Sequence, residues 1–150
     1  MNRVDDPIYT LGYQGHTTET FLRKLRQAKV ELLLDVRRNA VSRKQGFSKG
    51  LLRDLCQSNG IGYIHLRELG VPSSFRKSLR GPEDYAKVLD YYERKLLPEA
   101  SDARHQAVKL VKEKCTVLLC FEQDANCCHR ARLAEAISSE TGMRVVHLQP

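Results

Sequence analysis

The stretch that decides the fold runs from Val117 to Arg130 and reads Val-Leu-Leu-Cys-Phe-Glu-Gln-Asp-Ala-Asn-Cys-Cys-His-Arg. It begins as an unbroken apolar run, as in a strand covered on both faces, and ends in reactive and charged side chains. A helical pattern of apolar residues follows at Leu133, Ala134 and Ile137. The polar groups therefore lie where a strand ends and a helix begins, which is where open α/β sheets place their ligands.

Strand-like and helical segments alternate along the rest of the chain. Strand character covers residues 8–11, 32–36, 61–65, 115–121 and 143–148, and helical patterns lie between these runs. This alternation predicts an α/β fold: one three-layer domain over residues 1–150, with about five mostly parallel strands and helices on both faces, Rossmann-like or flavodoxin-like. Parallel strands bring the polar residues after the first four strands to one edge of the sheet.

Two helical segments carry more specific expectations. The helix that follows Ser48 is expected to turn Leu51, Leu52 and Leu55 inward. Farther along, Pro98 is expected to divide a helix that starts near Pro82 from the next one.

Composition places the chain among globular proteins that lie outside the membrane. The 150 residues are 41% hydrophobic, and they contain neither an apolar run near 18 residues nor a signal-like start. We therefore expect a cytoplasmic location and no membrane partner. The five cysteines are odd in number and irregularly spaced, so reduced thiols are expected.

The net charge of +7 is unevenly distributed. Residues 1–80 carry +8 and residues 81–150 carry −1, and no acidic residue interrupts six cations between Asp35 and Asp54. Such a segment attracts an anionic partner, although a solvated basic face is the simpler interpretation. Residues 66–81 are also polar and cationic, and we expect them to form a mobile basic loop that acts as a lid.

Asp35 lies at the end of an apolar strand, where a buried carboxylate is costly unless it is paired. Arg37 shares its side of an extended strand, and Arg130 is a second candidate partner. A purely structural Asp that fastens loops is an equally good interpretation.

Arg130 is expected in the first turns of a helix, where it meets the positive end of the helix dipole. On a helical wheel it falls on the sheet-facing side, so a carboxylate such as Glu122 or Asp35, or a bound anion, is expected to compensate it. A structural clamp is the alternative.

Spacing excludes several standard sites around the cysteines. A phosphatase loop needs an arginine six positions after its cysteine, and Asn126 stands six after Cys120. Zinc ligation by Cys120, Cys127, Cys128 and His129 is chemically possible, but adjacent cysteines are not the two-residue-spaced pairs of structural zinc sites. No phosphate-binding glycine motif follows the first strand. We therefore expect neither a metal nor a cofactor.

Four groups of residues match a known family in order and spacing: Tyr9 to Tyr13; Asp35-Val36-Arg37 with Ser42-Arg43 and Gly46-Phe47; Tyr63-x-His65 with Leu69-Gly70; and Leu119 to Glu122 with Cys128-His129-Arg130. On these motifs the chain resembles the bacterial domain-of-unknown-function 488 family. Ala40 and Ala125 stand where the family has prolines. The resemblance implies the architecture and the site location, but no reaction. It points to Cys128, whereas the helical wheel places Cys127 on the core side.

The leading hypothesis is a small enzyme with an arginine-rich pocket that acts on a phosphate-bearing metabolite, nucleotide or nucleic acid. The substrate-binding residues expected are Tyr13, Arg37, Arg38, Ser42, Arg43 and Arg130. The catalytic candidates are Asp35 or Glu122 as acid or base, His65 or His129 in proton transfer, and Cys128 as nucleophile or packed thiol. The alternative is a non-catalytic nucleic-acid-binding module that uses residues 37–53.

Overall fold

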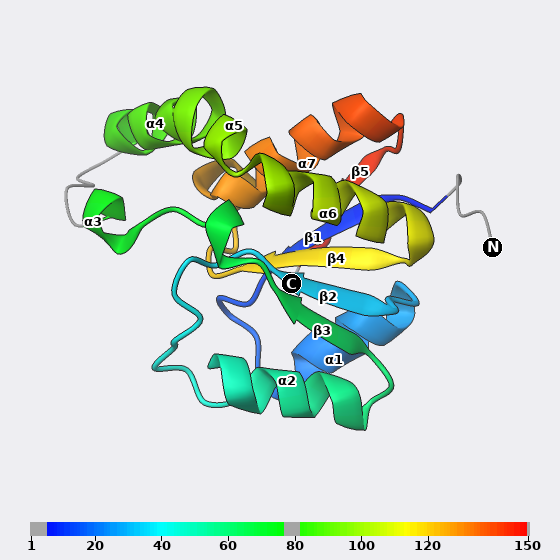
Figure 1. Cartoon of the computed structure of the whole chain (residues 1–150). Helices are drawn as coiled ribbons and strands as arrows, with labels where there is room; N and C mark the ends of the chain where they lie inside the picture. Colours follow the sequence, from blue (N-terminus) through cyan, green and yellow to red (C-terminus); the bar gives the residue numbers. More distant parts are fainter. Residues whose placement is uncertain (1–5, 77–81, 150) are drawn as a thin grey trace.

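The computed structural model describes residues 6–76 and 82–149, and its centre is one parallel sheet. The sheet runs in the order β3-β2-β4-β1-β5 (Figure 1). Its strands are β1 (Ile8–Gly12), β2 (Leu32–Asp35), β3 (Gly62–His65), β4 (Thr116–Cys120) and β5 (Val145–His147). The predicted α/β class, with a single sheet of five parallel strands, is confirmed.

Strand β4 lies between β1 and β2, so the order differs from the Rossmann and flavodoxin orders, in which β4 is not next to β2. Pairing aligns Gly12 with Cys120, and Asp35 with both Leu119 and His65. The carboxyl ends of β1 to β4 therefore meet at one edge, as the sequence predicted.

Helices α1 (Thr18–Gln27) and α2 (Lys49–Ser58) cover one face of the sheet (Figure 1). Thr17 begins α1 with a capping box, in which its hydroxyl accepts from the backbone N–H of Thr20. The prediction that Leu51, Leu52 and Leu55 of α2 point inward is partly wrong, because Leu52 is buried while Leu51 is 59% exposed. The helix is rotated so that Cys56, one turn after Leu52, takes the core position.

The other face is covered by the segments between β3 and β5 (Figure 1). They are the 3-10 turn η1 (Arg67–Leu69), α3 (Ser73–Arg76), α4 (Pro82–Tyr91), the π-helical η2 (Tyr92–Leu96), α5 (Leu97–Glu99), α6 (Ser101–Glu113), the 3-10 turn η3 (Ala125–Cys127) and α7 (His129–Thr141). Pro98 does not divide two helices as expected. It lies inside a helical run that continues from α4 through η2 to Glu99, and Ala100 separates α5 from α6.

The segment expected to form a basic lid begins inside the core. Leu66, Leu69 and Val71 are buried, and the Tyr92 hydroxyl donates to the Leu69 carbonyl over 2.7 Å. Residues 77–81 of this segment lie outside the described residues, and the lid stays a prediction. Within the described ranges, no helix has the length and apolar character needed to cross a membrane.

Candidate functional site

A buried ion pair stands at the end of β2. Asp35 is fully buried and Arg37 is 4% exposed. The Arg37 guanidinium donates from Nε to Asp35 Oδ1 over 2.8 Å and from Nη2 to Oδ2 over 2.7 Å. Of the two candidate partners for Asp35, Arg37 is therefore the one that pairs with it, and the two-point contact is the strongest geometry for such a pair.

Strand β3 adds two side chains to this pair. The Tyr63 hydroxyl donates to Asp35 Oδ2, and the His65 ring contacts the Arg37 carbonyl through Nε2 at 2.7 Å. Because a carbonyl only accepts, Nε2 carries the proton of His65. Burial, followed by the charge of Asp35 and the hydrogen bond to it, raises the pKa of Tyr63, so Tyr63 stays a neutral donor.

Arg37 also reaches two other segments with its remaining Nη1. This atom donates to the Phe47 carbonyl over 2.7 Å and to the Tyr13 hydroxyl over 3.4 Å, and the Tyr13 ring stacks on the Phe47 ring at 4.7 Å between centroids. Burial disfavours the charge of Arg37, but the contacts with Asp35 outweigh it and raise the pKa. Arg37 thus joins the loops after β1 and β2.

A cavity of about 410 Å³ opens above these residues at the carboxyl edge. Its lining contains three cations that extend beyond the ion pair, Arg38, Arg43 and Lys44, and it contains no acidic residue. The remaining lining residues are Tyr13, Arg37, Asn39, Val41, Ser42, Val71, Ser73 and Phe121. The cavity therefore combines positive charge with hydroxyl and aromatic groups.

The cationic segment after β2 is held in shape by two serines. The Ser48 hydroxyl donates to the Ser42 carbonyl over 3.1 Å and accepts from the Ser42 N–H over 3.0 Å, while Ser42 Oγ accepts from the Lys44 N–H. These bonds position the segment without a ligand, which lowers the entropic cost of binding one.

Arg130 is the second buried arginine, and it is fully buried at the start of α7. Its guanidinium donates to Thr10 Oγ1 over 3.1 Å, to Cys120 Sγ over 3.2 Å and to the carbonyls of Glu122 and Gln123. In the described part of the chain no carboxylate oxygen lies within 4 Å of it, so the expected ion pair with Glu122 or Asp35 is not formed. Burial lowers its pKa to about 10, an effect that the charges of Glu122 and Asp124 oppose.

The cysteines of this segment differ from the sequence-based expectation in two ways. Cys120 and Cys128 are joined by a disulfide, with their Cα atoms 7.4 Å apart, so the expectation that all thiols are reduced is wrong for this pair. The wheel was also wrong about Cys127, which is exposed. Residues 125–127 form a 3-10 turn, and α7 starts only at His129, so Cys128, the cysteine to which the family resemblance points, becomes the buried N-cap.

His129 lies beside this pair and is itself buried. Its Nε2 contacts the Val36 carbonyl at 2.7 Å, so Nε2 carries the proton and Nδ1 faces Cys128 Sγ at 3.9 Å. One ring nitrogen of His129 and the sulfurs of Cys120 and Cys128 all lie within 4.8 Å of one another. Once reduced, these residues have the donor types of a zinc site.

The predicted site residues fall into two groups. Tyr13, Arg37, Arg38, Ser42 and Arg43 line the edge cavity, with Asp35 and His65 bonded beneath it. Glu122, Cys128 and His129 instead line a separate hollow of about 20 Å³, which shares Val71 with the cavity. Arg130 lines neither space.

Sequence reasoning missed several residues of this edge. The Tyr63 hydroxyl donates a hydrogen bond to Asp35, and the Thr10 hydroxyl accepts one from Arg130. Lys44 and Phe121 line the cavity. A signal existed for Tyr63, because it lies two residues before His65 in a strand expected beside Asp35. Thr10 belongs to the family motif Tyr9 to Tyr13, but a threonine inside a strand is ordinary, so nothing indicated that it would accept from Arg130.

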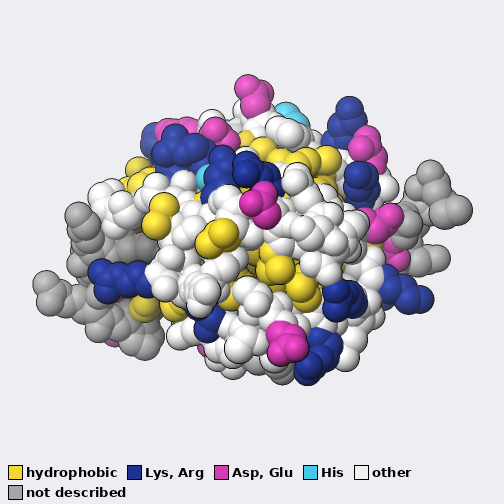
Figure 2. Space-filling view, turned by 90° about the horizontal axis from the view of Figure 1, so that it is seen from below, with side chains coloured by type: hydrophobic (Ala, Val, Ile, Leu, Met, Phe, Trp, Pro, Cys, Tyr) yellow, Lys and Arg dark blue, Asp and Glu magenta, His cyan; other side chains and the backbone are white. Residues whose placement is uncertain are grey.

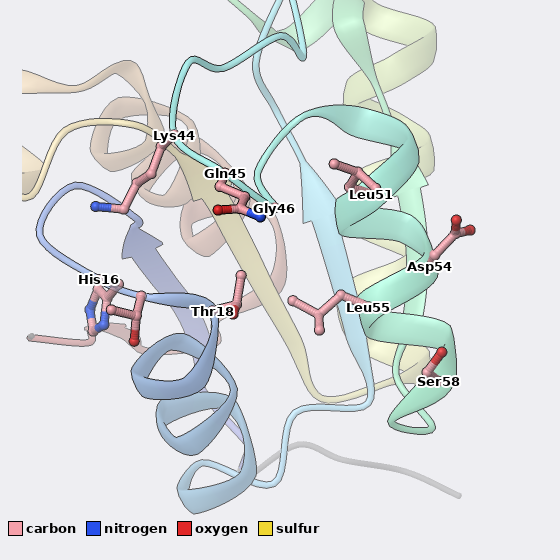
Figure 3. A pocket seen from close by; sticks show the side chains of 10 residues that line it. His16, Thr18, Lys44, Gln45, Gly46, Leu51, Asp54, Leu55 and Ser58 are labelled. Atoms are coloured by element: carbon pink, nitrogen blue, oxygen red, sulfur yellow. The ribbon is translucent and has the colours of Figure 1, made fainter.

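Another hollow lies away from the sheet edge, between α1 and α2 (Figure 3). It has a volume of about 620 Å³ and is lined by Leu51 and Leu55 of α2 and by His16, Thr18 and Lys44. Figure 2, which views the molecule from the side of these helices, shows apolar side chains gathered between charged ones. Unlike the edge cavity, this groove has an acidic residue, Asp54, in its lining, and Lys44 is the only Lys or Arg among the residues that line it.

His16 at this groove is a buried histidine whose charge depends on pH. The residue is 3% exposed and its Nε2 has no hydrogen-bond partner among the described residues. Burial, then the charges of Lys24 and Lys44, lower its pKa below 6.5. The neutral form is favoured by the folded state, so His16 supports stability above about pH 6.5 and that support is lost as the pH falls.

An NMR pH titration of the His16 ring should therefore show a midpoint below about 6.5. The His16→Gln variant should lose less stability than the parent between neutral and mildly acidic pH. A ring that titrates at or above the ordinary value would contradict this burial.

Fold and site together define an α/β protein with a doubly covered parallel sheet and a cavity lined by cations at its carboxyl edge. The model of the family described as domain of unknown function DUF488 matches residues 17–137, and the chain belongs to this family. No curated protein and no solved structure matches the chain.

Proposed function

We propose that this protein is a small enzyme that binds a phosphate-bearing metabolite or nucleotide in the edge cavity. The observation that carries the proposal is the cavity itself: three cations, no acid, and a position at the carboxyl ends of parallel strands. Arg38 is half-buried and Arg43 is exposed, so their charges are accessible from the cavity.

The ion pair beneath the cavity supports binding rather than contacting the ligand. Asp35 accepts hydrogen bonds from Arg37 and Tyr63. The guanidinium of Arg37 donates its hydrogen bonds to Asp35, Phe47 and Tyr13. Their role is to hold the floor rigid, as a site needs if its cations are to converge on one anion. The anion contacts then come from Arg38, Arg43 and Lys44.

Tyr13 is the group best placed to act on a ligand from the floor. Its hydroxyl oxygen accepts from Arg37, which leaves the hydroxyl proton free to be donated to an anion in the cavity. The Phe121 ring meets the Tyr13 ring edge-on at 5.3 Å, and both rings line the cavity. This aromatic wall suits a planar group attached to the phosphate.

Calorimetric titration with pyrophosphate tests the proposal. The parent should bind one pyrophosphate, and Arg43→Gln should weaken binding about tenfold, because one charge-assisted hydrogen bond is lost. Arg53→Gln is the matched control: Arg53 is 47% exposed on α2 and does not line the cavity. If both substitutions weakened pyrophosphate binding equally, the anion would be bound by the general positive charge of the surface and not by the cavity.

A titration with an oligonucleotide distinguishes this enzyme from the alternative, a nucleic-acid-binding module built on residues 37–53. For that module, affinity for an oligonucleotide should fall steeply with salt, and both Arg43→Gln and Arg53→Gln should weaken it. The volume of the cavity, about 410 Å³, and the burial of Arg37 favour the small ligand.

A further inference from the structure

We propose that Cys120 and Cys128 form a reversible thiol–disulfide pair, a redox site separate from the edge cavity. Cys128 is the sulfur that exchanges with a small disulfide or thiol, and Cys120 is the resolving sulfur. Neither cysteine lines the edge cavity, so this site does not depend on the proposed binding function.

Cys128 has the surroundings of a reactive thiol. It is the N-cap of the 13-residue helix α7, and its sulfur accepts from the Arg130 N–H over 3.5 Å. A helix amino terminus stabilises a thiolate at this position. The unprotonated Nδ1 of His129 lies 3.9 Å from the same sulfur, where it can take the thiol proton.

Cys120 faces a different partner. Its sulfur is fully buried and lies 3.2 Å from Nη1 of Arg130, and it contacts Glu122 Oε2 at 3.5 Å. The acceptors of the Arg130 guanidinium in the described chain are neutral oxygens and this sulfur. A Cys120 thiolate would lie directly beside Nη1 of this buried guanidinium, and their attraction would stabilise the reduced state against the opposing charge of Glu122.

Access distinguishes the two sulfurs. Cys128 lines the hollow of about 20 Å³ under α4, together with Tyr85, Val88 and Leu89, whereas Cys120 does not. A hollow of this volume has room for only one small chemical group. A compact reagent should therefore react with Cys128 faster than a bulky one. An incoming sulfur therefore meets Cys128 first.

The reaction balances as two exchange steps. The Cys128 thiolate attacks one sulfur of a small disulfide, forms a mixed disulfide and releases one thiolate. The Cys120 thiolate then attacks Cys128 Sγ, closes the Cys120–Cys128 bond and releases the second thiolate. Two electrons pass to the small disulfide, and the two protons from the cysteines end on the two small thiols.

The experiment uses the full chain carrying Cys127→Ser, because Cys127 is exposed and would react by itself. After complete reduction, the protein is mixed with bis(2-hydroxyethyl) disulfide, quenched by alkylation and mapped by peptide mass spectrometry. We expect a Cys120–Cys128 bond, with Cys56 and Cys115 alkylated only after unfolding. Adding Cys120→Ser should trap one mercaptoethanol on Cys128, and adding Cys128→Ser should slow trapping at Cys120 at least tenfold.

Two results would overturn the proposal. One is that both thiols of the Cys127→Ser protein stay free under conditions that oxidise a dithiol peptide. The other is that the reduced protein binds one zinc ion that protects both thiols from the disulfide, which would assign Cys120, Cys128 and His129 to a metal site. Mapping of the Cys127→Ser protein decides the question even if the serine variants at positions 120 and 128 fail to fold.

Discussion

Asp35→Asn is expected to lower the free energy of unfolding by about 3–5 kcal/mol, the usual cost of removing one member of a buried ion pair. The substitution leaves the Arg37 guanidinium 4% exposed and without its counterion, and it weakens the acceptor of the Tyr63 hydroxyl. Urea unfolding of the parent and the variant at the same pH measures the difference.

The chain provides a matched control for this substitution. Asp54 pairs with Arg53 at 3.5 Å, but the two side chains are 66% and 47% exposed. Asp54→Asn should therefore change stability by less than about 1 kcal/mol. If Asp35→Asn were as mild as Asp54→Asn, the Asp35–Arg37 pair could not be the floor on which the cavity is built.

Gly12→Ala is the second large effect, and it should destabilise the fold by at least about 3 kcal/mol through steric overlap. A Cβ atom at Gly12 would lie 1.7 Å from the backbone oxygen of Glu122 in the loop after β4. Main-chain hydrogen bonds from Tyr13 to Cys120 and from Gln14 to Phe121 hold this loop against the end of β1, so the carbonyl cannot easily move aside. The same carbonyl accepts from Arg130, so the change also disturbs the buried guanidinium. Thermal and urea unfolding should both show the loss.

Gly50→Ala separates steric overlap from the general effect of losing a glycine. Gly50 lies in α2, and an added Cβ meets no atom within 4 Å. Alanine should stabilise the helix there by about 0.5–1 kcal/mol. A Gly12→Ala protein as stable as the parent would show that the loop after β4 does not lie against β1.

Much of the fold follows from local pattern alone. The continuous apolar runs that end in polar residues at Asp35 and Cys120 mark central strands, and parallel order then brings their ends together. The wrong predictions concern residues whose burial changes when a helix is rotated, or its start is shifted, by one residue. Leu51 and Cys127 are exposed because the helices α2 and α7 are set by packing and by their first turn, which a wheel does not determine.

The candidate site was only partly predictable for a different reason. The pairing of Asp35 with Arg37 could be proposed because both residues belong to one extended segment. Arg130 is compensated by backbone carbonyls, Thr10 and Cys120, and carbonyl direction depends on loop geometry that side-chain types do not encode. Strand order was also needed, since β4 lies between β2 and β1 and brings Phe121 into the cavity that Tyr13 and Arg37 line.

The edge cavity and the smaller hollow offer different chemistry at one edge of the sheet. Arg38, Arg43 and Lys44 face one space, and the sulfur chemistry of Cys128 faces the other. Val71 and the adjacent residues Phe121 and Glu122 connect them, because Val71 lines both and the two others line one each. A ligand in the cavity would therefore contact the same loop that carries the disulfide.

Binding of a phosphate group in the edge cavity can be followed by an amide NMR titration with pyrophosphate at constant ionic strength. Saturable shifts should concentrate at residues 38–44 and at Tyr13 and Phe121, and they should disappear together when Arg38, Arg43 and Lys44 are replaced by glutamine. Shifts that do not saturate, or that centre on the groove between α1 and α2 around Leu51 and Leu55, would contradict the account.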